Sequence, residues 1–350
     1  MNHQISQHFP MQPQNIVCPF SEEATNHQIW IHSQKERRYK CNTCNRTFSE
    51  TVGTPLYGLK TPVWIVALVL TLLAYGCPIQ AIVMAFGFDE RTVSQWHCRA
   101  GEHGKLVQQK IVCQGGLIMG QIQGDELWCR TQQGGVWIAT AIDVFSRLFI
   151  WGEVSMERKS HLIERVVEKV KLALKPSQAD ILWVTDGFGA WASSITKLFR
   201  QPVYTRKQGR PCLMLPQTIH IAQVIKRRVE RRIVEIERRL IHGSWNQVHD
   251  LVQRTQIDSG KVNTAYVERL NATLRAWIPA LARRSRTPAN RRRQMEAALF
   301  WTAVNYNFCR IHRSIGGTPA MAVGLSEQVW SVRDLLFCFR FKQISLHGVG

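Results

Sequence analysis

The stretch from Gln121 to Val154 constrains the fold most, and it reads QIQGDELWCRTQQGGVWIATAIDVFSRLFIWGEV. A segment ending in the acidic pair Asp125-Glu126, a glycine turn and two segments rich in β-branched and aromatic residues predict three neighbouring strands. Successive side chains of a strand point to opposite faces, so only one acid of the pair can join a shared cluster. We assign that role to Asp125, which places one carboxylate on a rigid sheet.

Two later stretches supply further acids. In DILWVTDGFGAW, a buried strand from Ile181 to Val184 delivers Asp186 to its end, and the glycines that follow permit a tight turn. The stretch NTAYVERLNATLRAW predicts a helix that carries Glu268, with Asn271 and Arg275 close by.

The order of elements from residue 115 to residue 198 is strand, strand, strand, helix, strand, helix. A mixed sheet covered by helices, as in the ribonuclease H-like α/β fold, is the architecture that this order favours. In that topology Asp125 and Asp186 reach adjacent strand ends. Asp143, which ends another strand, either stands near these acids or forms a turn, and the turn is the better interpretation.

The basic run KRRVERRIVEIERRL, residues 226–240, has two interpretations. It forms a basic helix with an apolar side, or it contains a strand from Arg232 onward. Its charge suits a track for phosphates or a solvated face, and the sequence does not separate the two. Further on, Met295 to Phe308 predicts an amphipathic helix, and the catalytic domain expected over 115–310 is followed by a C-terminal tail, 311–350.

Residues 61–110 read as a helix-turn-helix. One helix spans Pro62 to Tyr75, a second spans Pro78 to Phe86, and Asp89 caps a third. The exposed side of this third helix carries polar residues at four-residue spacing, namely Arg91, Gln95 and Arg99. Such side chains can reach base edges or phosphates in a DNA groove, although an ordinary helical bundle has the same pattern.

The first 15 residues lack periodicity and are expected to be mobile, and residues 16–60 resemble a zinc ribbon. Three cysteines are the candidate Zn²⁺ ligands: Cys18, Cys41 and Cys44. A serine stands where Cys18 would have its own paired cysteine, and His27 or His32 could provide the missing ligand. The alternative is a small basic knob that holds no metal.

Composition points to a polyanionic partner. The chain of 350 residues has 45 Lys and Arg against 25 Asp and Glu, a formal charge of +20 that is spread along its length. We therefore favour nucleic acid over a membrane surface. The ten cysteines are too sparse for a disulfide scaffold, and the N-terminus shows no signal sequence, so we expect a reducing cytoplasm. The most apolar run, Val63 to Tyr75, is too short to cross a bilayer.

Taken together, these segments resemble the DDE transposases of bacterial insertion sequences, most closely the insertion-sequence-one type with its retroviral-integrase-like catalytic domain. The resemblance extends over almost the whole chain. It rests on the combination of the helix-turn-helix with CNTCNRTFSETVGTPLYGLK, DELW, VERLNATLR and YNFCRIHRSIGGTPA.

The resemblance implies a catalytic triad of Asp125 in DELW, Asp186 in VTDGFGAW and Glu268 in VERLN. The triad would hold two Mg²⁺ ions, which Mn²⁺ can replace, with Asp125 bridging both. Hard oxygen ligands on separate elements suit such ions. Asn263 and Arg275 match supporting positions that contact metal-bound water or DNA phosphate.

The expected function is binding of double-stranded DNA at terminal inverted repeats, followed by strand cleavage and strand transfer into target DNA. A homodimer or larger assembly, associated with the bacterial nucleoid, is implied by the family. Two alternatives remain: an inert DNA-binding relic of a transposase, and a ribonuclease H-like nuclease that makes no joined product.

Overall fold

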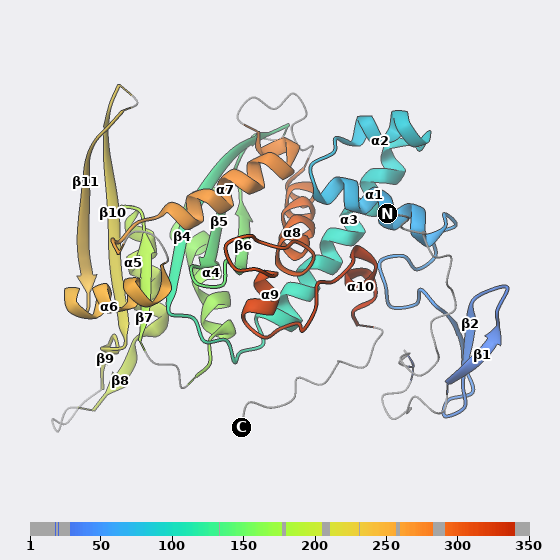
Figure 1. Ribbon diagram of the computed structural model, residues 1–350, viewed down its shortest axis with the longest axis horizontal. Helices are drawn as coiled ribbons and strands as arrows, with labels where there is room; N and C mark the ends of the chain where they lie inside the picture. Colours follow the sequence, from blue (N-terminus) through green and yellow to red (C-terminus); the bar gives the residue numbers. More distant parts are fainter. Residues whose placement is uncertain are drawn as a thin grey trace. The chain divides into compact units, whose positions relative to one another are not determined.

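The computed structural model describes residues 18, 20, 29–132, 134–176, 180–204, 211–230, 232–256, 260–282 and 291–339 (Figure 1). The chain divides into two compact units. One comprises residues 1–69 with 331–350, and the other comprises residues 70–330. Within the described ranges, no helix has both the length and the apolarity to cross a membrane.

A mixed sheet of six strands forms the centre of the larger unit, so the predicted α/β class with a mixed sheet is confirmed. Its strands are β4 (Gln121–Thr131), β5 (Gly134–Asp143), β6 (Phe149–Ser155), β7 (Ile181–Thr185), β10 (Ile219–Val229) and β11 (Arg232–His242). They lie in the order β11-β10-β7-β4-β5-β6. The predicted three-strand meander is β4-β5-β6, β7 and β10 run parallel to β4, and β11 returns antiparallel to β10. A separate two-stranded sheet joins β8 (Gln201–Val203) and β9 (Cys212–Met214).

Helices cover both faces of this sheet. The helices are α4 (Ser160–Ala173), α5 (Gly189–Phe199), α6 (Trp245–Thr255), α7 (Ala265–Trp277) and α8 (Arg292–Phe308). Of two short helices, η4 (Pro279–Leu281) contacts β4 and α9 (Pro319–Ala322) packs on α8. In Figure 1, α7 runs across β4 and β5, which it contacts. Alternate side chains of β4 point to opposite helices, because Gly124 lies against Trp191 of α5 while Leu127 packs in one cluster with Leu270 of α7.

The helix predicted from Met295 to Phe308 exists, but the prediction that it is amphipathic is wrong. Side chains on every side of α8 are buried, including Leu299, Trp301 and Val304. The reason is that α8 packs against both α3 (Glu90–Val107) and β6, so it has no broad solvent-facing side.

The predicted helix-turn-helix segment contains α1 (Val63–Ala74), α2 (Ile79–Phe86) and α3. Asp89 caps α3 as predicted, because its carboxylate accepts hydrogen bonds from the N–H groups of Arg91 at 2.9 Å and Thr92 at 3.2 Å. The third helix extends to Val107 and continues into a π-helical turn, η3 (Gln108–Val112).

The basic run from residue 226 to residue 240 is a hairpin of β10 and β11 rather than a helix. Its β-branched residues favour strand, and Glu230 takes a positive φ of 48° at the turn. The second of the two interpretations of this run is therefore the correct one.

The smaller unit contains a three-stranded antiparallel sheet of β1 (Ile29–Ser33), β2 (Arg38–Cys41) and β3 (Thr47–Ser49). Its core includes Tyr39 and Phe48, and α10 (Val332–Phe337) begins with a capping box of Ser331 and Asp334. The first 15 residues and His27 lie outside the described residues.

Gly101 allows α3 to approach α8 closely. A Cβ on Gly101 would lie 2.3 Å from the Ala297 Cα, so we expect Gly101→Ala to lower the free energy of unfolding by about 1–3 kcal/mol or more. Urea denaturation followed by tryptophan fluorescence measures the change. The matched control is Gly189→Ala at the start of α5, where nothing lies within 4 Å of the added carbon. Equal stability of the two variants would contradict this account of the α3–α8 contact.

Candidate functional site

Asp125 and Asp186 lie side by side, although not as two strand ends. The prediction that the first strand ends at the acidic pair is wrong, because β4 continues to Thr131, paired with β5 through contacts such as Leu127 with Ile138. The strand that ends here is β7, whose Thr185 pairs with Gly124. The next residue in each segment is an aspartate, so parallel pairing places Asp125 and Asp186 next to each other, near enough for the charge of Asp186 to act on the Asp125 carboxyl group.

Asn271 of α7 orients the Asp125 carboxylate. Its Nδ2 donates to Asp125 Oδ2 at 2.8 Å, while its Oδ1 accepts from the Thr140 hydroxyl at 3.1 Å. The other carboxylate oxygen of Asp125 accepts from the N–H of Glu126 at 2.8 Å. Asn271 and Thr140 are buried, so this side of Asp125 is fixed by the core.

Negative charge accumulates around Asp125. Burial raises the pKa of Asp125 to about 6; the hydrogen bond from the N–H of Glu126 opposes this, and the charges of Asp186 and Glu126 add to it. Burial also raises the pKa of Glu126. A divalent cation beside Asp125 and Asp186 would relieve this repulsion, so the donor set fits a hard metal ion.

Glu126 points to the opposite face of the sheet, as the alternation along a strand requires. Its carboxylate accepts hydrogen bonds from the Trp191 indole and from Arg158, whose Nη2 lies 2.6 Å away. The Trp191 ring lies directly against Gly124, where a Cβ would come within 2.6 Å of it. The absence of a side chain at Gly124 therefore makes room for the Trp191 ring. The Glu126 side chain lies on the face of the sheet that α5 covers.

A buried glutamine fixes the start of α7 to β4. Gln123 Oε1 accepts from the N–H groups of Tyr266 and Val267, each at 3.0 Å, and its Nε2 donates to the Asn263 carbonyl at 2.6 Å. Asn263 Oδ1 accepts from the N–H of Ala265 at 3.0 Å, which satisfies another free amide of the first turn. Asn263 therefore supports the site by shaping the helix start.

The position of Glu268 follows from this placement of α7. It lies three residues before Asn271, hence on the same side of the helix, and Arg275 lies four residues after Asn271. The Glu268 carboxylate accepts from the Thr264 hydroxyl at 2.8 Å and forms an ion pair with Lys226 of β10. Among the described residues the three acids do not form a group with all donor atoms within 4.8 Å. The site is thus two aspartates that are adjacent across neighbouring strands, with a glutamate on α7 that is paired with lysine.

Two of the predicted DNA-contacting side chains of α3 are exposed. Arg91 and Gln95 are on the surface, and Arg99 is partly buried. Arg293 of α8 donates to Glu102 at 2.9 Å through Nε, which helps to hold this face of α3 in place. The structure thus presents these residues on one helix that is fixed to α8.

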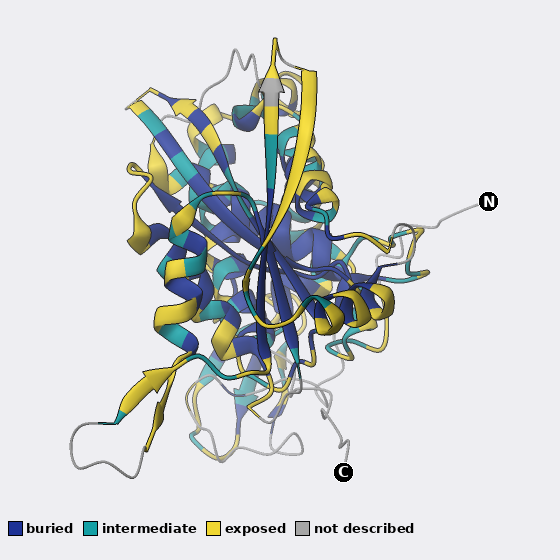
Figure 2. Ribbon diagram, turned by 90° about the vertical axis from the view of Figure 1, so that its left-hand side faces the viewer, coloured by how far each residue is buried: buried dark blue, intermediate teal, exposed yellow. Residues whose placement is uncertain are grey.

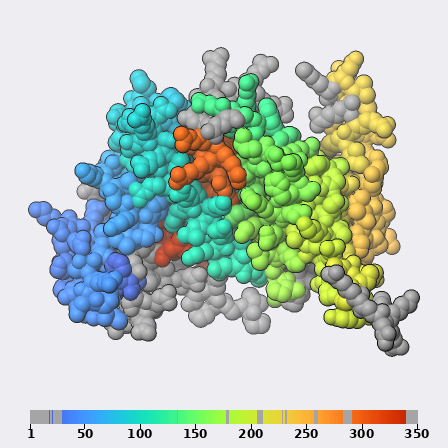
Figure 3. Space-filling model, turned by 180° about the vertical axis from the view of Figure 1, so that it is seen from behind, coloured from blue at the N-terminus to red at the C-terminus, as the bar shows by residue number. Residues whose placement is uncertain are grey.

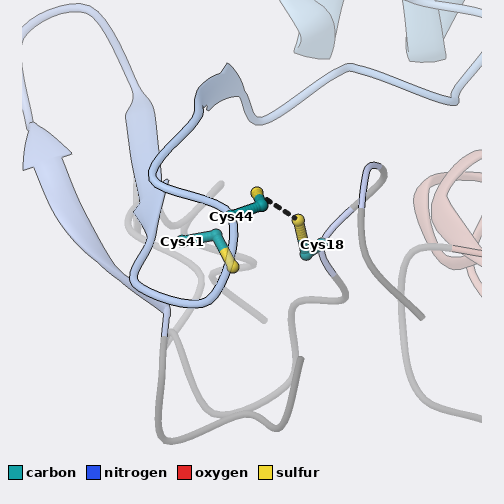
Figure 4. Close-up of side chains that lie close together, drawn as sticks. All are labelled: Cys18, Cys41 and Cys44. Carbon is teal, nitrogen blue, oxygen red and sulfur yellow. Dashed lines mark hydrogen bonds between the residues drawn. The ribbon is translucent and has the colours of Figure 1, made fainter. Parts of the chain in front are cut away.

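The three predicted zinc ligands meet in the smaller unit (Figure 4). The sulfur atoms of Cys18, Cys41 and Cys44 lie within 4.8 Å of one another, and those of Cys18 and Cys44 are 3.6 Å apart. A tetrahedral zinc with bonds of about 2.3 Å separates its sulfur ligands by about 3.8 Å, so the cluster fits this ion. In the described part of the chain no fourth residue joins the group, and His32 is exposed on β1.

The thiols of this cluster differ in acidity. Burial raises the pKa of Cys18. Burial acts on Cys41 in the same direction, but hydrogen bonds from the Cys44 and Thr43 N–H groups and the Thr43 hydroxyl lower the pKa of Cys41 to about 7. A thiolate at Cys41 is the form that binds metal.

The sequence did not single out Gln123, Lys226 or the bonding role of Asn271. Gln123 stands two residues before Asp125 on the same face, which is the one pattern that could have marked it. Asp143 forms a turn, as the better interpretation held, because its Oδ2 accepts from the N–H of Ser146 at 2.9 Å and from its hydroxyl at 2.6 Å.

Comparison of the chain with protein-family models found no match, and comparison with curated proteins found none either. The chemistry of the site is therefore argued from its own residues.

We expect Asp125→Asn to change how stability depends on pH. Because the folded pKa of Asp125 is raised to about 6 from an ordinary value near 4, ionisation destabilises the fold as pH rises through that window. Without divalent ions, the variant should gain stability relative to the parent between pH 4 and pH 8, by up to about 3 kcal/mol. Urea denaturation in chelator measures this. The raised pKa of Asp125 would be contradicted if Asp125→Asn left the free energy of unfolding unchanged, or increased it more at pH 4 than at pH 8.

We expect the purified chain to contain zinc and Cys41→Ser to lose it, since a hydroxyl is a poor zinc ligand. Elemental analysis by mass spectrometry measures the zinc bound per chain. Cys212→Ser is the control, because Cys212 is exposed and lies outside the cluster. Equal zinc in the parent and both variants would show that the metal is held elsewhere, and no zinc in any of them would favour the metal-free knob.

Proposed function

We propose that this protein is a metal-dependent DNA transposase of the DDE type, which cleaves DNA at terminal inverted repeats and joins the end to target DNA. The observation that carries the proposal is the juxtaposition of Asp125 with Asp186 beside the helix that carries Glu268. The strand order β6-β5-β4-β7-β10 is compatible with a ribonuclease H-like core, in which acids at this position hold divalent ions.

Each residue of the site has a chemical role in this proposal. Bound Mg²⁺ would neutralise charge on the attacked phosphate and activate a water or a 3′-hydroxyl. Asp125, which is held by Asn271, and Asp186, which follows the neighbouring strand, would offer oxygen ligands to this ion. Glu268 would provide a third ligand in exchange for its ion pair with Lys226, and the freed ammonium would then be available to a DNA phosphate.

The remaining parts of the proposal concern DNA. The formal charge of +20 supports a polyanionic partner, and the exposed Arg91 and Gln95 on α3 support groove or phosphate contacts. The cysteine cluster supports a zinc ribbon as a second DNA-contacting element. Paired DNA ends would require at least two copies of the chain.

Cleavage and joining assays test the proposal directly. On DNA carrying the flanking terminal repeats, with Mg²⁺ or Mn²⁺, the parent should form joined product, and Asp125→Asn, Asp186→Asn and Glu268→Gln should each reduce it by at least about 100-fold. DNA binding should persist in all three, because each change removes charge but little volume. Glu164→Gln is the matched control, an acid on α4 that is paired with Lys197.

The products separate the competing functions. Joined product that disappears in all three variants supports a transposase. Nicks without joining would favour a nuclease, whereas repeat binding by the parent with neither reaction would favour an inert DNA-binding relic.

A further inference from the structure

The turn that carries Asp186 contains one large apolar side chain. Between the end of β7 and the start of α5 the chain reads Asp186, Gly187 and Phe188, and Gly189 begins the helix. The Phe188 N–H donates to Asp186 Oδ1 at 3.0 Å, which ties the carboxylate to the backbone of its own turn. Phe188 is the N-cap residue of α5, and among the described residues no side chain caps this helix. Glycine on either side of Phe188 leaves the backbone conformationally free, so the Phe188 ring is the group through which this turn can be anchored.

Arg158 lies on the Phe188 ring. Its guanidinium carbon is 4.0 Å from the centre of that ring and 4.9 Å from the centre of the Trp137 ring on β5. Both distances are those of cation–π contacts. Arg158 belongs to the segment between β6 and α4, and α4 and α5 lie against each other, as the green and lime atoms in Figure 3 show. Arg158 therefore connects the turn before α4 to the turn before α5.

Glu126 fixes Arg158 from within the sheet. The Glu126 side chain is only 2% exposed, and its Oε2 accepts from Arg158 Nε at 3.1 Å and from Nη2 at 2.6 Å. Two N–H groups of one planar guanidinium on the same carboxylate define the orientation of that guanidinium. Oε1 of Glu126 accepts from the Trp191 indole, so the carboxylate is held as well. Figure 2 shows the central strands mostly in dark blue, hence buried, so this anchor lies in the most rigid part of the unit.

We propose that Arg158 is a positioning residue for the Asp186 carboxylate. Held by Glu126, Arg158 keeps the Phe188 ring in place, and the Phe188 N–H then keeps the Asp186 carboxylate in one orientation. Glu126, the acid of the DELW pair that points away from Asp125, thus acts on the site from the opposite face of the sheet. The positioning role requires neither metal nor DNA. Its effect on metal binding rests on the proposed function, in which Asp186 is a ligand.

Hydrogen exchange without metal or DNA tests the positioning. The Phe188 amide should be protected in the parent, and Arg158→Lys should speed its exchange by at least about tenfold, because an ammonium has no flat face to stack on the ring. NMR of the full chain measures the rate. The matched control is Arg165→Lys, which should leave the rate unchanged. Arg165 Nη1 donates at 3.0 Å to Glu153, which also accepts from a tryptophan indole but lies on the edge strand β6.

Binding of Mn²⁺ in the absence of DNA, measured by titration calorimetry, tests the consequence for the site. Arg158→Gln removes a positive charge, so electrostatics alone would tighten the binding of a cation. Positioning predicts the reverse, and Arg158→Gln should weaken Mn²⁺ binding by at least about tenfold. Arg165→Gln, which removes the same charge, should not weaken it. Phe188→Ala leaves the pair of Glu126 and Arg158 intact, and it should weaken binding as Arg158→Gln does.

The two measurements separate this inference from the proposed function. Unchanged exchange of the Phe188 amide in Arg158→Lys, or tighter Mn²⁺ binding by Arg158→Gln, would overturn the positioning role. If the loss of the ion pair unfolds Arg158→Gln, the exchange in Arg158→Lys and the Mn²⁺ affinity of Phe188→Ala decide it. A parent that binds no Mn²⁺ would contradict the proposed function instead, and the exchange of the Phe188 amide alone would then decide the role of Arg158.

Discussion

The candidate site depends on the attachment of α7 to β4 by one buried side chain. Gln123 uses its carbonyl oxygen for two N–H groups of the first helical turn and its amide for the Asn263 carbonyl. A helix start has free N–H groups that water would otherwise satisfy, so burying it against a sheet requires such an acceptor. With this turn fixed, the helix brings Asn271 to Asp125 and places Glu268 one turn earlier.

The electrostatics of the site work against the stability of the fold. Asp125 is half-buried near two other carboxylates, and its raised pKa records the free energy that ionisation costs. Glu268, which is more exposed, is balanced by Lys226. Groups arranged in this way are more useful for binding a cation than for stabilising a fold, which is why the arrangement indicates function.

Sequence patterns predicted the elements well where periodicity was strong. The meander, the helix found as α4, the strand before Asp186 and the Asp89 cap were confirmed, because each depends on local preferences. The continuation of β4 beyond Glu126 was missed, because its outward residues are polar or aromatic and only pairing with β5 shows that the strand continues. The burial of α8 was missed for a similar reason, since helices packed on several sides lose the amphipathic pattern.

The contacts within the site were less predictable, since they join residues far apart in the sequence. Asn271 and Asp125 are separated by 146 positions, and Lys226 and Glu268 by 42. No local pattern connects such pairs. The triad itself was proposed from the resemblance to a family, and the structure adds to it the residues that hold two of the acids.

The hairpin links the candidate site to the sheet edge. Lys226 of β10 lies directly opposite Ile236 of β11, the edge strand of the sheet. A hairpin that projects alone is only marginally ordered, because two strands bury little apolar surface. β10 pairs with β7 only as far as Gln223, so Lys226 lies in the part of the hairpin beyond this pairing, and its ion pair with Glu268 joins that part to α7.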